Sequence, residues 1–132
     1  MEKTLMIIKP DAVRGRHVGD VISRVEKEAF AITGLRYLQL TKDQAESFYA
    51  IHKERPFFAG LVKYMTGGPV VVGRLEREHA VEHWRKVIGA TDPAKAEPGT
   101  IRNLYGTNIE SNAVHGSDSP QNGEFETNFF FA

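Results

Sequence analysis

Val70-Val71-Val72 is the stretch that decides the fold of this chain of 132 residues. Three successive β-branched residues predict a strand that is buried on both faces and central in its sheet. Gly67-Gly68-Pro69 comes directly before it and ends a helix that opens at Pro56, whose apolar residues are Phe57, Phe58, Leu61, Val62 and Met65. On the other side, the pattern predicts a helix over residues 76–88.

Three more strands and three more helices follow from the same kind of pattern. Apolar residues predict a short buried strand over residues 4–9, a second strand over 30–40 and a short final strand over 112–117. After a loop at 15–19, apolar residues spaced three and four apart predict an amphipathic helix from Val18 to Ala29. Thr41 and Gln44 form a capping-box pattern for a helix through about His52. Ser119-Pro120 starts a terminal helix that ends in Phe129-Phe130-Phe131.

Residues 89–111 are rich in Gly and Pro and have few periodic apolar positions, so we expect a long irregular loop there, before the last strand. The order of elements predicts an α+β fold: a ferredoxin-like βαββαβ sandwich whose antiparallel sheet is covered by helices. The length predicts a single domain over residues 1–132.

Composition excludes several classes of function. Lys and Arg number 17 and Asp and Glu number 17, so no global positive field favours nucleic acid or a membrane surface. The absence of Cys excludes disulfides, zinc–thiolate sites and cysteine nucleophiles. No apolar run has the length of a membrane span, and the first residues do not form a signal-peptide core. We therefore expect a cytoplasmic protein without a nucleic-acid or membrane partner.

The segment Asn112–Ser119 reads NAVHGSDS and places His115 among small and hydroxylic residues just before a helix start. Imidazole is nucleophilic and titrates near neutral pH, so such a histidine can carry a transferable group. The alternative is a histidine whose hydrogen bonds are satisfied in a turn, and these eight residues do not decide between the two.

Phosphate could be bound by several side chains spread through the chain, because arginine forks fit phosphate oxygens and lysine adds a point charge. Taken singly, each is more often a solvated surface residue than a ligand. The sequence has no P-loop and no Gly-x-Gly-x-x-Gly motif, so a nucleotide would need a different cradle. The candidates are Lys9, Arg55, Arg85, Thr91, Arg102 and Asn112.

A rival motif is His79-Ala80-Val81-Glu82-His83, which reads H-x-x-E-H, the inverted zinc-protease signature. Two histidines four apart on a helix share a face, as metal ligation requires. The pattern is short and lacks a third ligand at the spacing of such enzymes. We therefore interpret His79 and His83 as part of a solvated helix face.

Six blocks, read together, resemble the nucleoside diphosphate kinases in order and spacing over nearly the whole chain. The most specific of them is the His-Gly-Ser-Asp-Ser segment. The blocks are Lys9-Pro10-Asp11, Arg55-Pro56-Phe57-Phe58, Gly67-Gly68-Pro69, Gly89-Ala90-Thr91-Asp92-Pro93, Pro98-Gly99-Thr100-Ile101-Arg102 and His115-Gly116-Ser117-Asp118-Ser119.

The resemblance implies a ping-pong transfer between nucleoside di- and triphosphates. A nucleoside triphosphate, typically ATP, would give its γ-phosphoryl group to a histidine, and a nucleoside diphosphate would then take it, with low base specificity. Mg²⁺ would bridge phosphate oxygens, so no protein metal ligand is expected. The family also implies a homo-oligomer built from dimers.

Residue roles implied by the resemblance begin with His115 as the nucleophile and Glu126 as the carboxylate that orients its imidazole. Tyr49 and Lys9 match the residues around the γ-phosphate, and Lys9 also reaches toward the sugar. The remaining matches are nucleotide ligands: Arg85 and Thr91 for the β-phosphate, Arg102 near the transferring group, Asn112 for the ribose hydroxyl and Phe57 for stacking on the base.

Two segments depart from the family pattern. Asn103-Leu104-Tyr105 stands where Gly-Asp-Phe is usual, which predicts an altered loop or subunit contact. Gln121-Asn122-Gly123 are poor helix formers, which predicts a weakened or shifted helix around Glu126. These departures motivate a second hypothesis, a catalytically weak nucleotide-binding or scaffold protein that keeps the fold.

Overall fold

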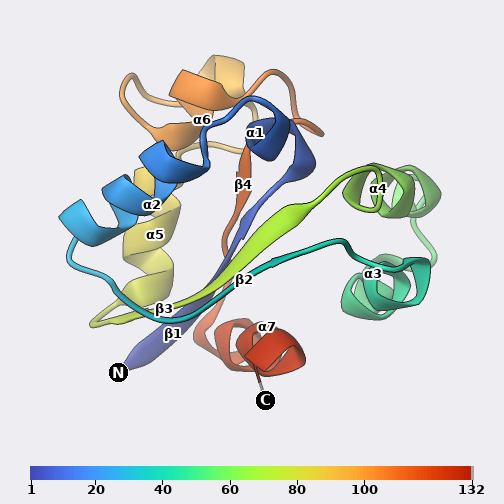
Figure 1. Ribbon diagram of the computed structural model, residues 1–132, viewed down its shortest axis with the longest axis horizontal. Helices are drawn as coiled ribbons and strands as arrows, with labels where there is room; N and C mark the ends of the chain where they lie inside the picture. Colours follow the sequence, from blue (N-terminus) through green and yellow to red (C-terminus); the bar gives the residue numbers. More distant parts are fainter. Residues whose placement is uncertain (132) are drawn as a thin grey trace.

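The core of the fold is a four-stranded antiparallel sheet with strand order β2-β3-β1-β4, seen in a computed structural model that describes residues 1–131 (Figure 1). The strands are β1 (Glu2–Ile8), β2 (Ala31–Leu38), β3 (Val70–Arg77) and β4 (Val114–His115). The ferredoxin-like sheet and the central place of Val70-Val71-Val72 are thereby confirmed. Every side chain from Thr4 to Ile8 is buried, because β1 lies between β3 and β4 and both of its faces are covered.

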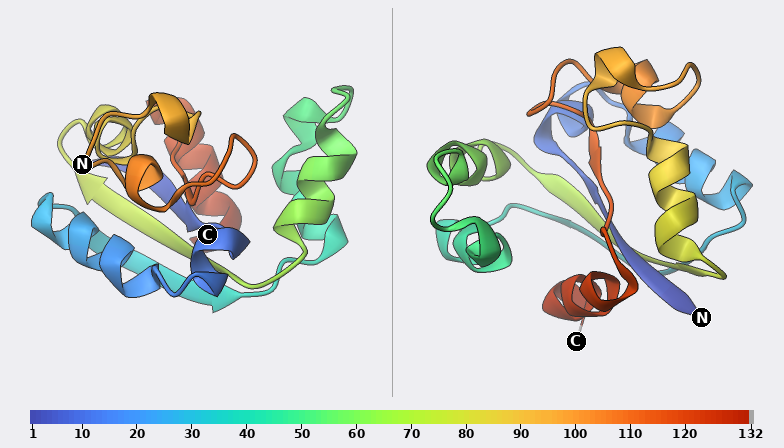
Figure 2. Two further views of the ribbon diagram at one scale, coloured as in Figure 1. Left: turned by 90° about the horizontal axis from the view of Figure 1, so that it is seen from above. Right: turned by 180° about the vertical axis from the view of Figure 1, so that it is seen from behind.

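Helices cover the sheet, as predicted, and they lie on both of its faces. On one face, α2 (Val18–Lys27) and α5 (Ala80–Ile88) pack with Met6 and Ile8 of β1. On the other face, α7 (Pro120–Phe131) and the pair α3 (Lys42–Phe48) and α4 (Phe58–Met65) pack with Leu5 and Ile7. The α3–α4 pair projects to one side, away from α2 and α5 (Figure 2). None of the helices within residues 1–131 has the length and apolarity needed to cross a bilayer.

Local signals account for several boundaries. The Thr41 hydroxyl accepts a hydrogen bond from the Gln44 backbone N–H, and the Gln44 side chain accepts one from the Thr41 N–H, so the predicted capping box is confirmed. The helix ends at Phe48 and is continued by a 3₁₀ turn, η1 (Ala50–His52). In α2 the buried Val21 and Val25 lie one turn apart, as the amphipathic pattern predicts.

Some predicted boundaries are wrong. Glu76 and Arg77 belong to β3, where they pair with Lys3 and Glu2, and the next helix begins only at Ala80. Cross-strand pairing outweighs the helix propensity of these residues. Phe30 precedes β2, and Pro56 lies in a turn before α4. The last strand contains only two residues rather than six.

The segment 89–111 is more structured than expected. It contains the 3₁₀ turn η2 (Pro93–Lys95) and the helix α6 (Ile101–Tyr105), capped by the side chains of Asp92 and Thr100 respectively. A further short helix, α1 (Pro10–Arg14), follows β1 with Pro10 at its first position. The caps were present in the sequence, but helices of five residues carry too little periodicity to be predicted.

The terminal helix α7 is continuous through Gly123, contrary to the expectation that Gln121-Asn122-Gly123 would weaken or shift it. Its start is capped by Ser119, whose hydroxyl accepts from the Asn122 N–H. A Cβ atom on Gly123 would lie 2.1 Å from the Lys3 carbonyl oxygen of β1, so only glycine permits this approach. Gly123 lowers the local helix propensity, yet it allows α7 to pack directly against β1.

We predict that Gly123→Ala destabilises the protein, because the added methyl group collides with backbone that cannot rotate away. The expected loss is about 2 kcal/mol or more of unfolding free energy, the range of overpacked cores. Chemical denaturation measures it. The matched control is Gly19→Ala in α2, where nothing lies within 4 Å of the added Cβ; there we expect a gain of up to about 1 kcal/mol from helix propensity. Equal effects at both sites would contradict the close-approach explanation.

Candidate active site

His115 lies on β4, and three elements distant in sequence fix its position. Its Nε2 is 2.9 Å from Glu126 Oε1 on α7, and its backbone oxygen accepts a hydrogen bond from the Trp84 indole of α5 at 3.1 Å. The Phe48 ring of α3 meets the imidazole edge to face, with 5.9 Å between ring centroids. The imidazole is about one-fifth exposed, so it is held in place and still accessible.

Glu126 is held by a second contact. The Ser117 hydroxyl donates to the same Glu126 oxygen at 2.6 Å and accepts from the Leu5 backbone N–H at 3.0 Å. A fully buried serine two residues after β4 therefore positions the carboxylate that meets His115. Burial raises the pKa of the Tyr49 phenol above its ordinary value, and the charge of Glu126 acts in the same direction.

Lys9 and Asn112 form a second group at the end of β1. The Lys9 ammonium donates to Asn112 Oδ1 at 2.8 Å, and Asn112 Nδ2 donates to the Thr91 carbonyl at 3.0 Å. Burial and the neighbouring Arg102 lower the pKa of Lys9 to about 8, although Asp11 and Glu110 act in the opposite direction. A lysine with so low a pKa is typical of a functional cleft.

Arg102 connects this group to the histidine strand. Its guanidinium donates to the carbonyl oxygens of Gly89 and Val114, both at 3.0 Å, and burial with the nearby Arg85 lowers its pKa to about 10. Its Nε is buried and has no hydrogen-bond partner within residues 1–131. A buried N–H without an acceptor is costly, so Arg102 is suited to an additional anionic ligand.

The other predicted residues lie around this centre. Arg85 is exposed on the last turn of α5, as the sequence indicated, and Thr91 is exposed with its backbone oxygen bound to Asn112. Phe57 is 52% exposed at the start of α4 and contacts only the His52 ring among the aromatic pairs of the described chain. The structure thus joins the histidine group and the lysine group, and leaves Phe57 apart from them.

The H-x-x-E-H hypothesis does not survive the geometry. His79 is in a left-handed conformation before α5 begins, so it does not share a helix face with His83. His83 Nε2 is bound to Glu28 Oε1 at 2.9 Å, which lowers the pKa of that carboxyl. The interpretation of a solvated helix face is therefore wrong in detail, because His83 joins α5 to the end of α2.

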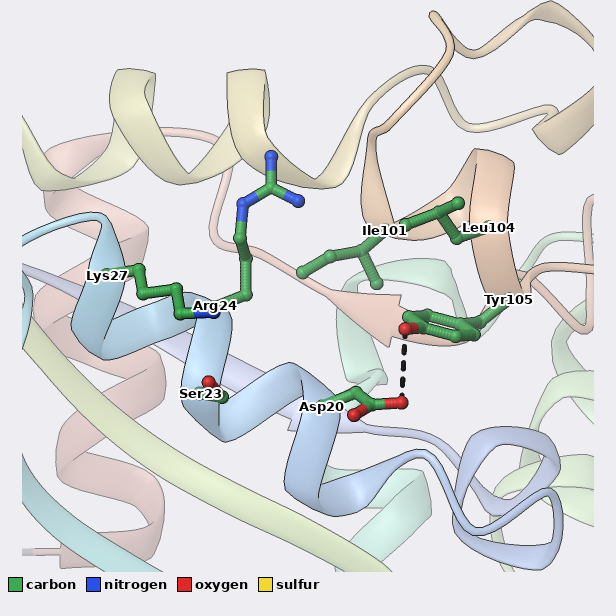
Figure 3. Close-up of a pocket in the computed structure, with 7 residues that line it drawn as sticks. All are labelled: Asp20, Ser23, Arg24, Lys27, Ile101, Leu104 and Tyr105. Atoms are coloured by element: carbon green, nitrogen blue, oxygen red, sulfur yellow. Dashed lines mark hydrogen bonds between the residues drawn. The ribbon is translucent and has the colours of Figure 1, made fainter.

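The departure at Asn103-Leu104-Tyr105 makes its own local contacts. The Asn103 side chain accepts from the Gly99 N–H at 3.2 Å, and the Tyr105 hydroxyl donates to Asp20 at 3.2 Å. Figure 3 shows Tyr105 and Asp20 on either side of a pocket of about 190 Å³ between α6 and α2. The Tyr105 ring also stacks on His17. These contacts hold α6, the helix that carries Arg102.

Sequence reasoning missed the structural importance of Ser117 and Trp84. Ser117 belongs to a motif already singled out, yet nothing in its position shows that it bonds both β1 and Glu126. For Trp84 a signal was available: a tryptophan on the apolar face of a helix must find an acceptor for its N–H. That acceptor is the carbonyl of His115.

The sequence is similar to those of known proteins over its whole length. A family profile described as "Nucleoside diphosphate kinase" matches residues 2–132. The nucleoside diphosphate kinase of Geotalea uraniireducens is 52% identical over 132 residues, which cover 100% of this chain and 96% of that protein. The one from Nitratiruptor sp. is 54% identical, with the same coverage.

Solved structures agree as well. The Aquifex aeolicus nucleoside diphosphate kinase superposes with a TM-score of 0.97 at 42% identity, over 99% of this chain and 95% of that one. The chain belongs to the nucleoside diphosphate kinase family. A Halobacterium salinarum nucleoside diphosphate kinase, solved in complex with CDP, superposes with a TM-score of 0.94 at 37% identity, over 98% of this chain and 87% of that one. As a member of the nucleoside diphosphate kinase family, the chain is an enzyme, a kinase and transferase that binds nucleotides.

We predict that Lys9 of the free enzyme titrates at a pKa of about 8 instead of 10.5, because burial and Arg102 disfavour its charge. NMR of the lysine side chain across pH 6 to 11 measures it. Glu110→Gln should lower this pKa further and Arg102→Met should raise it, since these charges act in opposite directions. Glu97→Gln, an exposed carboxylate elsewhere, is the control and should change nothing. A Lys9 midpoint above 10 would contradict the burial argument.

Proposed function

We propose that the chain transfers the γ-phosphoryl group of a nucleoside triphosphate, typically ATP, to a nucleoside diphosphate through a phosphohistidine at His115. The observation that carries the proposal is the hydrogen bond between His115 Nε2 and Glu126 Oε1. A carboxylate only accepts, so Nε2 carries the proton and Nδ1 keeps its lone pair. The imidazole is thereby prepared as a nucleophile at Nδ1.

In the first half of the reaction, Nδ1 attacks the γ-phosphorus while the bond from that phosphorus to the bridging oxygen breaks. The electron pair leaves with the nucleoside diphosphate, and the phosphoryl group stays on Nδ1. The imidazolium formed is stabilised by Glu126, whose position Ser117 holds. In the second half, an oxygen of another diphosphate attacks the same phosphorus and the N–P bond breaks.

The cations of the site suit the charge of the transferring group. Lys9 and the unpaired Nε of Arg102 would stabilise the charge on the equatorial oxygens, beside Tyr49. Arg85 and Thr91 would bind the β-phosphate, and Asn112 would bind the ribose hydroxyl. The exposed ring of Phe57 would stack on the base, and stacking tolerates every base, which supports low base specificity.

Mg²⁺ fits this site only through the nucleotide. Within residues 1–131 no group of three or more acidic or histidine side chains could hold a metal ion, and Asp11 and Glu126 are already hydrogen-bonded. The ion would therefore coordinate phosphate oxygens, and its chemistry when bound would be to neutralise their charge. The protein residues would orient the nucleotide that carries it.

We extend the proposal to the oligomeric state and the cellular location of the protein. The outer edge of β2 has no neighbouring strand in the described chain, and Leu35 and Tyr37 on it are 47% and 68% exposed. An exposed strand edge with apolar side chains supports a homo-oligomer built from dimers. A cytoplasmic location stays a prediction from composition.

We predict that incubation with Mg²⁺-ATP adds a single phosphoryl group to the protein, which mild acid removes and which passes to added GDP. Intact-mass spectrometry measures each step. His115→Ala should form no adduct and lose transfer by more than about 1,000-fold, because the nucleophile is gone. Nucleotide binding should be largely retained, since the phosphate ligands stay in place.

The control is His79→Ala, an exposed histidine outside the site, which should phosphorylate like the wild type. ADP, CDP and UDP should accept the group at rates within about tenfold of GDP, as indifferent stacking requires. Full activity of His115→Ala would overturn the proposal. No adduct on the wild type with nucleotide bound would indicate the non-catalytic binding protein instead.

We predict that Tyr37→Glu shifts the protein toward smaller species, because like charges would face each other across a paired β2 edge. Sedimentation velocity at several concentrations measures the distribution. Lys27→Gln, at an exposed position of α2, is the control, because it changes the net charge by the same amount and in the same direction. A wild-type chain that sediments only as a monomer would contradict the oligomer.

A further inference from the structure

Ala113 has a φ of +76° although it is not glycine and is completely buried. The N–H of Val114 donates to the carbonyl of Asn112 at 2.9 Å, so residues 112–114 form a three-residue γ-turn of the positive-φ kind. Such a turn is rare and strained for a residue with a Cβ. It lies between Asn112 and His115, so its conformation decides how those two side chains are placed relative to each other.

Hydrogen bonds fix both backbone polar groups of Ala113. Its N–H donates to Asp11 Oδ2 at 3.0 Å, and its carbonyl accepts from the Lys9 N–H at 2.8 Å. Both partners belong to Lys9-Pro10-Asp11. This motif therefore has two separate roles. Its Lys9 ammonium binds Asn112, and its Asp11 carboxylate and Lys9 N–H hold the turn.

Asp11 is itself held by Tyr64 of α4. The Tyr64 hydroxyl donates to Asp11 Oδ1 and accepts from the Asp11 N–H at 3.3 Å. Burial and the bond to Asp11 raise the pKa of Tyr64 to about 12. A phenol is protonated at neutral pH with or without this rise, so it can donate to the carboxylate. The carboxylate thus has one oxygen on the turn and the other on α4.

A simpler role for Asp11 would be stabilisation of α1, since it is an acidic residue in the first turn of that helix. Asp43 occupies the same second position in α3. No side-chain hydrogen bond involves Asp43 in the described chain, whereas Asp11 meets Ala113 and Tyr64. A helix-dipole role would make the two residues equivalent, and their surroundings are different.

We propose that Asp11 and Tyr64 are positioning residues that hold the strained turn at Ala113 and thereby align His115 with Asn112. The inference rests on the proposed phosphohistidine function for its catalytic consequence. Neither residue needs to touch the nucleotide. Without them the turn relaxes toward negative φ, and His115 loses its alignment while the phosphate ligands stay in place.

The test combines Asp11→Ala with Ala113→Gly, because glycine adopts a positive φ without a steric penalty. Asp11→Ala should lower the single-turnover rate of phosphohistidine formation at saturating ATP by about 10- to 100-fold, the effect of a misplacement near 1 Å. KM should change less than kcat. Adding Ala113→Gly should recover about tenfold of that rate, because the relaxed turn is no longer favoured.

If Asp11→Ala does not fold, the conservative variants Asp11→Asn and Tyr64→Phe replace it in the test. Each should lower the single-turnover rate of phosphohistidine formation, by less than Asp11→Ala would. Asp43→Ala is the matched control and should leave the rate unchanged. A lowered Tm with full kcat in Asp11→Ala would show a merely structural role and overturn the proposal. The same holds if the double variant recovers nothing or if Asp43→Ala is equally slow.

Trp84 separates this inference from the proposed function. It is the single tryptophan, it is buried, and its N–H donates to the His115 carbonyl. Acrylamide quenching of its fluorescence should increase in Asp11→Ala and return toward wild type in the double variant, whether or not the enzyme transfers phosphate. If the wild-type protein forms no phosphohistidine, only the proposed function is contradicted. Unchanged quenching in every variant would contradict the proposal that Asp11 holds the turn at Ala113.

Discussion

The direct contact between the backbone of α7 and the backbone of β1 is the constraint on which the site depends. Gly123, Glu126, Thr127 and Phe130 are spaced so that they share one face of the helix. Gly123 sets the distance to Lys3, Thr127 and Phe130 are buried, and Glu126 meets His115. A helix that stood farther from the sheet would leave the imidazole without its carboxylate.

This inner face explains why the sequence indicated a weak helix. Most helices show a stripe of large apolar residues to the core, but the contact face of α7 contains a glycine, a glutamate and a threonine. These residues allow α7 to approach the sheet closely and to form hydrogen bonds, but they do not bury large apolar side chains. Helix propensity measures the isolated chain, so it could not show that Gly123 strengthens the packing that it locally disfavours.

Elements whose signal is local could be predicted, as the capping box at Thr41 and the buried Val70-Val71-Val72 strand show. Features that depend on a distant partner could not. Glu76 is in a strand because Lys3 lies opposite, and His83 is bound because Glu28, the residue that follows α2, lies beside it. His115, Lys9 and Asn112 were candidates from residue type alone, whereas Glu126 was predicted only through the resemblance. The structure brings these four residues into two hydrogen-bonded pairs. Of their supporting residues, Ser117 gave no pattern of its own, and Trp84 indicated only that its N–H needs an acceptor, not that the acceptor is the His115 carbonyl.

Two costly features lie next to each other around His115. The turn at Ala113 is strained, and the Nε of Arg102 is buried without a hydrogen-bond partner within residues 1–131. They meet at β4, because Arg102 donates to the carbonyl of Val114, the residue that closes the turn. The strand itself has only two residues and two pairs with β1, which is too little to hold such a conformation. Side chains from α1, α5, α6 and α7 must therefore supply the order that the strand lacks. Held in this way, His115 keeps Nε2 hydrogen-bonded to Glu126 and leaves Nδ1 for the nucleotide. The backbone pairing of a longer, regular strand would not by itself orient the imidazole like this.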